Sequence, residues 1–186
     1  MKYKITKPPE TEPITLEEAK KYLRVPHDED DSLIELNISQ ARQAVESSQN
    51  RAIAKQTIRQ FLDKFPNDNQ PIILAKPPLK ELKSFKLNGE EYNDYVLDDK
   101  QEPALIYPKN EWTEIETKPN IIELEFEAGY EKEEIPKTTI AAMYQFLAHF
   151  YEVRGIVIDS QVNEIQYTVD WLIQKDRIDP RLFNSG

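Results

Sequence analysis

Histidine is the side chain most often used to carry protons in catalysis, and this chain contains only two histidines. His27 stands beside the acidic residues 28–31, a position typical of a solvated helix start. His149 lies in a strongly apolar segment, where a hydrogen-bonded core or interface histidine is the simpler interpretation. The two are far apart in the sequence and show no paired metal-binding spacing. The sequence therefore predicts neither a catalytic nor a metal-ligating histidine.

Groups of carboxylates could also bind a metal ion or catalyse hydrolysis. The run at residues 27–31 suggests a calcium loop, but it lacks the central glycine and the twelfth-position carboxylate that an EF-hand requires. Glu123 and Glu125 have the spacing of a strand, where alternate glutamates face solvent, and Glu133 and Glu134 are consecutive. A hydrolase that uses Glu123 and Glu125 is kept as a rival hypothesis, since it predicts loss of activity on Glu→Gln substitution.

Composition removes further classes of activity. The chain has no cysteine, which excludes disulfides, thiolate catalysis and cysteine-bound metals. It has four glycines and neither a Gly-x-Gly-x-x-Gly nor a Gly-Lys-Ser/Thr string, so no phosphate-binding loop of those types is present. We therefore predict a protein that is not an enzyme and that holds no cofactor and no metal.

The net charge of this 186-residue chain is -10, which argues against independent binding to nucleic acid. An acidic surface could still line a duct through which DNA slides without being held, although solubility is the simpler explanation of the charge. The first ten residues lack the apolar run of a signal peptide, and no stretch reaches the roughly 20 apolar residues of a membrane span. We expect a soluble protein made in the cytoplasm.

Two helices are predicted near the start of the chain. Residues 1–14 contain three prolines and alternating charge, which predicts an extended N-terminal arm. Thr15 and Glu18 have the spacing of a capping box, and Pro26 prevents the first helix from continuing. Apolar residues then recur at helical spacing through residues 32–48, after an acidic start.

The middle of the chain has the pattern of strands. Asn88-Gly89 is the strongest two-residue hairpin signal in the sequence. Short alternating or apolar runs surround it and predict an antiparallel β-region of five or six strands. The predicted strands lie in residues 56–65, 72–74, 82–87, 94–97, 104–107 and 121–126.

Helical spacing returns after Pro136, which suits the first turn of a helix. A last helix is predicted around residues 169–174, and residues 156–166 between the two are ambiguous. The predicted fold class is α+β, with a helical bundle (an N-terminal helical pair plus C-terminal helices) and an inserted small antiparallel β-region. The predicted organisation is an arm at 1–14, a helical core at 15–55 plus 135–178, the β-region at 56–134 and a tail at 179–186.

Aromatic residues broaden the apolar surface of the helix after Pro136. Tyr144, Phe146, Phe150 and Tyr151 cover more of its circumference than one contact requires, which indicates a second contact with the β-region or a neighbouring subunit. Trp171 could serve either as a core clasp or as part of a docking segment, and the core interpretation is the simpler one.

Several strings occur in a fixed order along residues 14–178. The opening string Ile-Thr-Leu-Glu-Glu-Ala-Lys-Lys-Tyr-Leu-Arg-Val is followed by an acidic run and a helix. The later strings are Arg51 leading into Gln56-Thr57, the Pro-Pro-Leu at 77–79, Phe-Glu-Ala-Gly-Tyr at 126–130, Ala-His-Phe-Tyr-Glu-Val-Arg at 148–154 and Trp-Leu-Ile-Gln-Lys-Asp-Arg at 171–177. Together these strings resemble the head–tail connector (adaptor) proteins of tailed bacteriophages, in the longer form with a β-insertion that is also found in gene transfer agents.

The resemblance implies a ring, usually of twelve copies, beneath the portal protein. Such a ring extends the DNA channel, joins the head to the tail through a stopper or tail-completion protein, and lets DNA pass without specific binding. It also implies that the C-terminal segment docks on the portal. The docking candidates are Trp171, Leu172, Arg177, Arg181, Leu182 and Phe183.

Two departures from the family pattern concern the C-terminal part of the chain. The link at residues 156–166 lacks the usual proline before the last helix, and the tail at 179–183 has no counterpart that can be aligned. The alternative function is a monomeric virion-associated binding module that recognises protein or carbohydrate through its β-region. Oligomeric state separates the two, since a binding module needs no ring.

Overall fold

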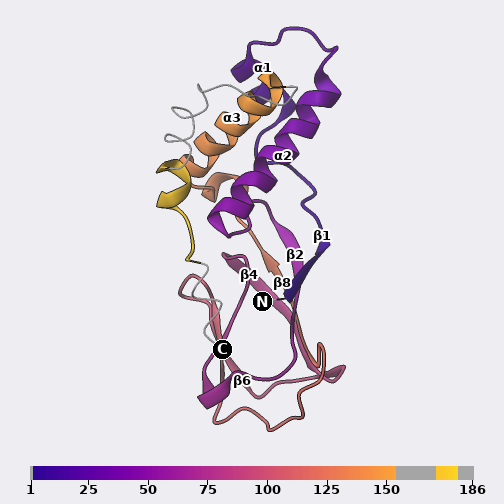
Figure 1. Ribbon diagram of the computed structural model, residues 1–186, viewed down its shortest axis with the longest axis vertical. Helices are drawn as coiled ribbons and strands as arrows, with labels where there is room; N and C mark the ends of the chain where they lie inside the picture. The colour runs from indigo at the N-terminus through magenta and orange to yellow at the C-terminus, as the bar shows by residue number, and fades with distance from the viewer. Residues whose placement is uncertain (1, 154–170, 180–186) are drawn as a thin grey trace. The chain divides into compact units, whose positions relative to one another are not determined.

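The computed structural model describes residues 2–153 and 171–179 and shows an α+β protein with antiparallel sheets, as predicted. The chain divides into two compact units (Figure 1). Of the described residues, the β unit comprises 2–10, 50–130 and 178–179, and the helical unit comprises 11–49, 131–153 and 171–177.

The larger sheet of the β unit has five strands in the order β1-β2-β8-β4-β5, all antiparallel to their neighbours. β8 is central, and its residues alternate strictly between buried and half-buried. Ile122, Leu124 and Phe126 form the buried row, whereas the intervening glutamates lie on the outer face. The strands are β1 (Lys2–Lys7), β2 (Gln56–Leu62), β4 (Leu79–Leu87), β5 (Glu90–Glu91) and β8 (Ile122–Ala128).

A second sheet, in the order β3-β7-β6, contributes to the same core. Its strands are β3 (Ile72–Ile73), β6 (Tyr95–Asp98) and β7 (Leu105–Pro108), and a short 3-10 helix, η1 (Asn67–Asn69), precedes them. Phe65 and Trp112 stack with ring centroids 4.6 Å apart, and the Trp112 indole donates to the carbonyl of Gln70 at 2.9 Å. The stacked pair thus fixes the connection between β2 and β3, which contains Phe65, against the connection between β7 and β8, which contains Trp112.

Several predicted elements are confirmed in the β unit. Asn88 and Gly89 both have positive φ, 53° and 86°, and join β4 to β5 as the hairpin signal predicted. Seven strands occupy the region in which five or six were predicted, because strands of two residues such as β5 show no alternation in the sequence. Residues 2–7, predicted as part of the extended arm, are extended and also pair with β2 as an edge strand.

The helical unit contains α1 (Leu16–Leu23), α2 (Asp31–Gln49) and α3 (Lys137–Glu152), preceded by the 3-10 helix η2 (Lys132–Glu134). The predicted capping box is present, since Thr15 accepts from the Glu18 amide at 3.2 Å and Glu18 accepts from the Thr15 amide at 2.8 Å. Arg24 ends α1 in the left-handed conformation two residues before Pro26. Residues 171–175 are also helical and overlap the last helix predicted around residues 169–174. In the described part of the chain, no helix is long and apolar enough to cross a membrane.

Gly129 marks a place where two backbones nearly touch. Its φ is +115°, and an added Cβ would lie 2.4 Å from the carbonyl oxygen of Ala54. Its amide donates to Pro78 at 3.0 Å, and the Tyr130 amide donates to Ile53 at 3.0 Å. The end of β8 is therefore tied both to the segment before β2 and to the segment before β4, and only glycine fits there.

We predict that Gly129→Ala destabilises the β unit strongly, by about 3 kcal/mol or more, because it adds a backbone clash to an unfavourable φ. Gly89→Ala is the matched control, because Gly89 also has a positive φ of 86° but has no atom within 4 Å of the added Cβ. It should cost about 1 kcal/mol. Urea unfolding measures both changes, and equal losses would contradict the close-approach explanation.

Candidate functional site

The residues considered for catalysis are not brought together into a site. His27 is exposed, and His149 is half-buried with its ring 5.9 Å from that of Phe150. Among the described residues, no group of three or more His, Asp or Glu side chains could hold a metal ion.

The glutamate pair of the rival hydrolase hypothesis is occupied by an arginine. Arg59 on β2 bonds Glu125 at 2.5 Å and lies 3.2 Å from Glu123, and both carboxylates come from the outer face of β8. The hydrogen bond to Glu125 raises the pKa of Arg59 despite some desolvation. Both carboxylates are therefore engaged by one guanidinium on the outer face of the sheet, and neither is left as a member of a free acid–base pair.

The outer face of the larger sheet is a ladder of alternating charge. Three glutamates of β8 lie in its middle, and cations lie on the strands at either side. Glu127 is 3.5 Å from Lys55 and 3.4 Å from Lys83, and Lys2 on β1 is 2.7 Å from Asp63. These exposed pairs stabilise the strand register weakly.

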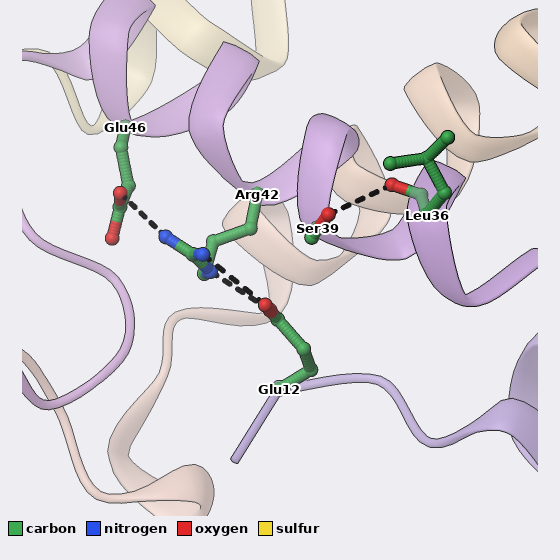
Figure 2. Close-up of polar contacts among 5 residues, drawn as sticks. All are labelled: Glu12, Leu36, Ser39, Arg42 and Glu46. Atoms are coloured by element: carbon green, nitrogen blue, oxygen red, sulfur yellow. Dashed lines mark hydrogen bonds and ion pairs between the residues drawn. The ribbon is translucent and has the colours of Figure 1, made fainter. Parts of the chain in front are cut away.

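The most buried charge of the helical unit is Arg42 on α2, which lies between two carboxylates (Figure 2). Its Nε bonds Glu12 at 2.7 Å, and its Nη1 bonds Glu46, one turn further along α2, at 2.9 Å. Burial alone would lower the pKa of Arg42, but the hydrogen bond to Glu12 and the charges of Glu46 and Glu12 outweigh it and raise the pKa. Glu12 precedes α1, so this ion triad fixes the segment that enters the helical unit.

Other polar groups lie buried along the same helix. Asn37 and Gln49 are 3% and 0% exposed, and Thr139 of α3 donates to the Gln49 side chain at 3.2 Å. Ser39, on the outer side of α2, donates to the carbonyl of Leu36, whose side chain is 53% exposed (Figure 2). The buried face of α2 thus contains polar as well as apolar residues. For that reason the apolar residues at helical spacing form an interrupted stripe in its sequence.

The broad aromatic surface predicted for α3 is only partly covered. Met143 and Leu147 are buried, whereas Phe146 and Phe150 are half-buried and contact each other with centroids 5.8 Å apart. Tyr22 of α1, 43% exposed, packs on Tyr144 with centroids 4.5 Å apart. Burial raises the pKa of Tyr144, and the nearby charge of Glu18 acts in the same direction.

The docking candidates at the C-terminus fall into three groups. Trp171 is 63% exposed and Arg177 is exposed, whereas Leu172 and Ile173 are buried. The core interpretation of Trp171 is therefore wrong, because its two neighbours take the inward positions. Asp176 directly follows the helical residues 171–175, and it anchors them to α3 by accepting hydrogen bonds from the hydroxyls of Thr138 and Thr139. Arg181, Leu182 and Phe183 lie outside the described residues.

Three of the strings noted in the sequence meet in the β unit. Arg51 donates to the hydroxyl of Tyr130, and its guanidinium lies 3.2 Å from the Glu102 carboxylate. The Ala52 amide donates to the carbonyl of Pro77 at 3.0 Å, which brings in the Pro-Pro string. Arg51 is 7% exposed, so these partners compensate a buried charge. The three strings therefore belong to segments that pack together at one junction, and their contacts there are structural.

Sequence reasoning missed the Glu12–Arg42–Glu46 triad and the pairing of β1 with β2. Arg42 and Glu46 have the i, i+4 spacing of a helical ion pair, which was the available signal. Glu12 gave no signal, because its contact spans 30 residues. The strand β1 could not be recognised for a similar reason, since each of its pairing partners lies at least 50 residues away.

Comparisons with known proteins agree on one family and one fold. A family model described as HCP, head completion protein, matches residues 12–171. Two chains of similar fold come from the neck of an empty gene transfer agent (GTA) particle computed with C6 symmetry (TM-score 0.79, 17% identity) and from the neck of a native GTA particle computed with C12 symmetry (0.71, 16%). A third comes from the virion of a native GTA particle (0.75, 16%), and each match covers 96% of both chains. No curated protein matches the sequence significantly.

We predict that Arg42→Met destabilises the helical unit by about 3 kcal/mol, because it leaves the Glu12 and Glu46 carboxylates without their shared cation. Adding Glu12→Gln and Glu46→Gln should recover most of this loss, since the unpaired charges are then removed. Thermal unfolding followed by circular dichroism measures both effects. Lys7→Met, which breaks the exposed pair with Glu10, is the control and should change stability little. A triple variant no more stable than Arg42→Met would contradict the charge explanation.

Proposed function

The chain belongs to the head completion protein family, and we propose that it acts as a structural head–tail connector of a tailed phage or phage-like particle. The observation that carries the proposal is the family match over residues 12–171. The common fold with chains from GTA particle necks supports it over nearly the full length of the chain. The place of action is the head–tail interface of the virion.

In this role the chain forms a ring beneath the portal protein, with twelve copies as the expected number. Neck structures computed with C6 and C12 symmetry contain chains of this fold, which supports a ring. The ring extends the DNA channel, and a stopper or tail-completion protein binds its other side. With a net charge of -10, the chain has little attraction for phosphate, so DNA passes without being held.

The two compact units suit different tasks in such a ring. The helical unit, with its buried ion triad and its partly covered aromatic residues, is proposed as the connector core of a helical bundle. The β unit is proposed as an insertion that projects outward or toward the tail. No catalytic step is needed, and the occupied glutamate pair on β8 agrees with a role that is not enzymatic.

The portal contact is proposed to use the exposed residues of the C-terminal segment. Trp171 and Arg177 offer an aromatic ring and a guanidinium to a partner, a combination common at the centres of interfaces. Lys175 lies 5.8 Å from the Trp171 ring and adds a second cation. Leu172, by contrast, is buried within the chain and supports the fold, so it is no longer a direct docking residue in this proposal.

The alternative, a monomeric binding module, would use a hollow of about 600 Å³ in the β unit. Its lining includes Trp112, Asp68 and Glu114, an aromatic and acidic set suited to a carbohydrate or a basic peptide. The indole of Trp112 is only 8% exposed, however, so it offers little stacking surface. The connector function is favoured for this reason.

Electron microscopy of the chain mixed with its cognate portal-bearing particles tests the connector function. We expect a ring of added density beneath the portal, with copies related by the portal axis. Particles lacking the portal are the control and should show no added density. A folded chain that binds no portal and stays monomeric would contradict the proposal and favour the binding module.

We predict that Trp171→Ala combined with Arg177→Ala weakens portal binding tenfold or more while leaving thermal stability nearly unchanged, because both side chains are exposed. Leu172→Ala should do the opposite and cost about 2 kcal/mol in stability, because Leu172 is buried. Point substitutions are preferable to deletion of residues 171–186, which would also uncover the core contacts of Leu172 and Ile173. Undiminished binding by the double variant would remove the C-terminal docking proposal.

A further inference from the structure

The edge strand β1 differs from the rest of this acidic chain. Its sequence, Lys-Tyr-Lys-Ile-Thr-Lys, holds three lysines and no acidic residue, whereas the whole chain carries a net charge of -10. Every residue of β1 is exposed, although the strand is paired with β2 along its length. A basic strand with every residue exposed, at the margin of a sheet, is an unusual feature in such a chain.

The two faces of β1 have different chemistry. Lys2 and Lys4 lie opposite Phe61 and Arg59 on the outer face of the sheet, whereas Tyr3 and Ile5 lie on the core face, opposite Gln60 and Ile58. Tyr3 and Ile5 are nevertheless 42% and 44% exposed, so the core does not cover this margin. One edge of β1 bonds β2, and its other edge has no strand beside it among the described residues. Lys2 and Lys7 already form ion pairs with Asp63 and Glu10, so the described contacts leave Lys4 as the lysine that is presented to a partner together with backbone groups and apolar side chains.

A segment of the same chain holds three glutamates between Lys109 and Lys118 and has the complementary character. Residues 109–118 form no strand or helix, and Glu111, Glu114 and Glu116 within them are exposed. Trp112 and Ile115, which alternate with these glutamates, contribute to the core of the β unit and hold the segment in place. The described contacts give Glu116 an ion pair with Lys118, but they give none to Glu111 or Glu114.

The exposed acidic run of the helical unit between α1 and α2 is less available. In the elbow between α1 and α2, Asp28 and Asp31 lie 2.5 Å and 2.6 Å from the Lys20 amine. Asp30 accepts from the Tyr151 hydroxyl at 2.6 Å. These carboxylates already stabilise the helical unit, which leaves the segment at 109–118 as the better acidic surface for an intermolecular contact.

We propose that β1 of one copy of this chain docks against residues 109–118 of the next copy. The contact joins two different surfaces, so it is directional, and repeated contacts of this kind close into a ring when the rotation between copies permits. The inference rests on the proposed ring function and adds to it the surfaces through which the β units associate. Lys4 of one copy then faces the glutamates of its neighbour, and an extended segment lies beside an open strand edge.

Site-directed crosslinking tests the contact cleanly, because the chain has no cysteine of its own. Lys4→Cys and Glu114→Cys are introduced into one full-length chain, and a short bis-maleimide is added both to the chain in solution and to the chain bound to portal-bearing particles. We expect a ladder of dimers, trimers and larger products on the particles. Each single variant should give at least tenfold less of the trimers and larger products. Lys4→Cys with Lys100→Cys is the matched control, because Lys100 is exposed in the β unit but lies outside the acidic segment.

Each remaining outcome decides against the proposed contact. Dimers from Lys4→Cys alone would indicate a symmetric contact between two β1 strands, and crosslinks confined within one chain would indicate that β1 and the acidic segment meet in the monomer. A ring visible by electron microscopy without the ladder would overturn this contact but leave the connector function intact. Absence of both the ring and the ladder would overturn the two together. If the Lys4→Cys, Glu114→Cys chain and the Lys100→Cys control gave the same yield of trimers and larger products, the crosslinks would reflect random collision between chains only.

Discussion

The β unit depends on one close approach between two backbones, that of Gly129 to Ala54. Strand β8 is central in the larger sheet, and it ends at Ala128, shortly before the chain enters the helical unit at residue 131. The carbonyl of Ala54 occupies the space in which any side chain at position 129 would begin. Because this contact sets where β8 ends relative to the segment before β2, the register of the two strands and the position of Arg51 beside Tyr130 follow from it. The chain has only four glycines, and the presence of one at position 129 thus has a geometric cause.

The helical unit meets a different constraint, the burial of charge. Arg42 is 6% exposed, and a guanidinium at that depth is tolerated only with anionic partners. Glu46 is supplied by the same helix, whereas Glu12 is supplied by the segment that precedes α1. A hydrophobic residue at position 42 could pack as well, but it would not require the entering segment to take one particular position. We interpret the triad as a device for fixing that position, with modest net benefit to stability.

Local signals in the sequence predicted local structure well. The capping box at Thr15 and Glu18, the Asn88-Gly89 hairpin and the α+β class are all confirmed, because each depends on contacts within a few residues. Contacts between distant segments could not be predicted in the same way. β1 becomes a strand only because β2 offers an edge, and Trp171 is exposed only because Leu172 and Ile173 take the inward positions. The ordered strings were sufficient to predict the family. They did not show that three of them pack together at the junction of Arg51, Pro77 and Tyr130.

Charge is distributed unevenly over this chain, and the distribution matters more than the total. A uniformly acidic protein would resist packing against copies of itself, since like charges would meet at every contact. Here the exposed lysines of β1 lie at one margin of the sheet, while the glutamates of residues 109–118 lie on a separate segment of the same unit. Two unlike surfaces on one chain favour head-to-tail contact over symmetric pairing, because a symmetric contact would set lysines against lysines. An acidic net charge that keeps phosphate at a distance is thereby compatible with close association between neighbouring copies.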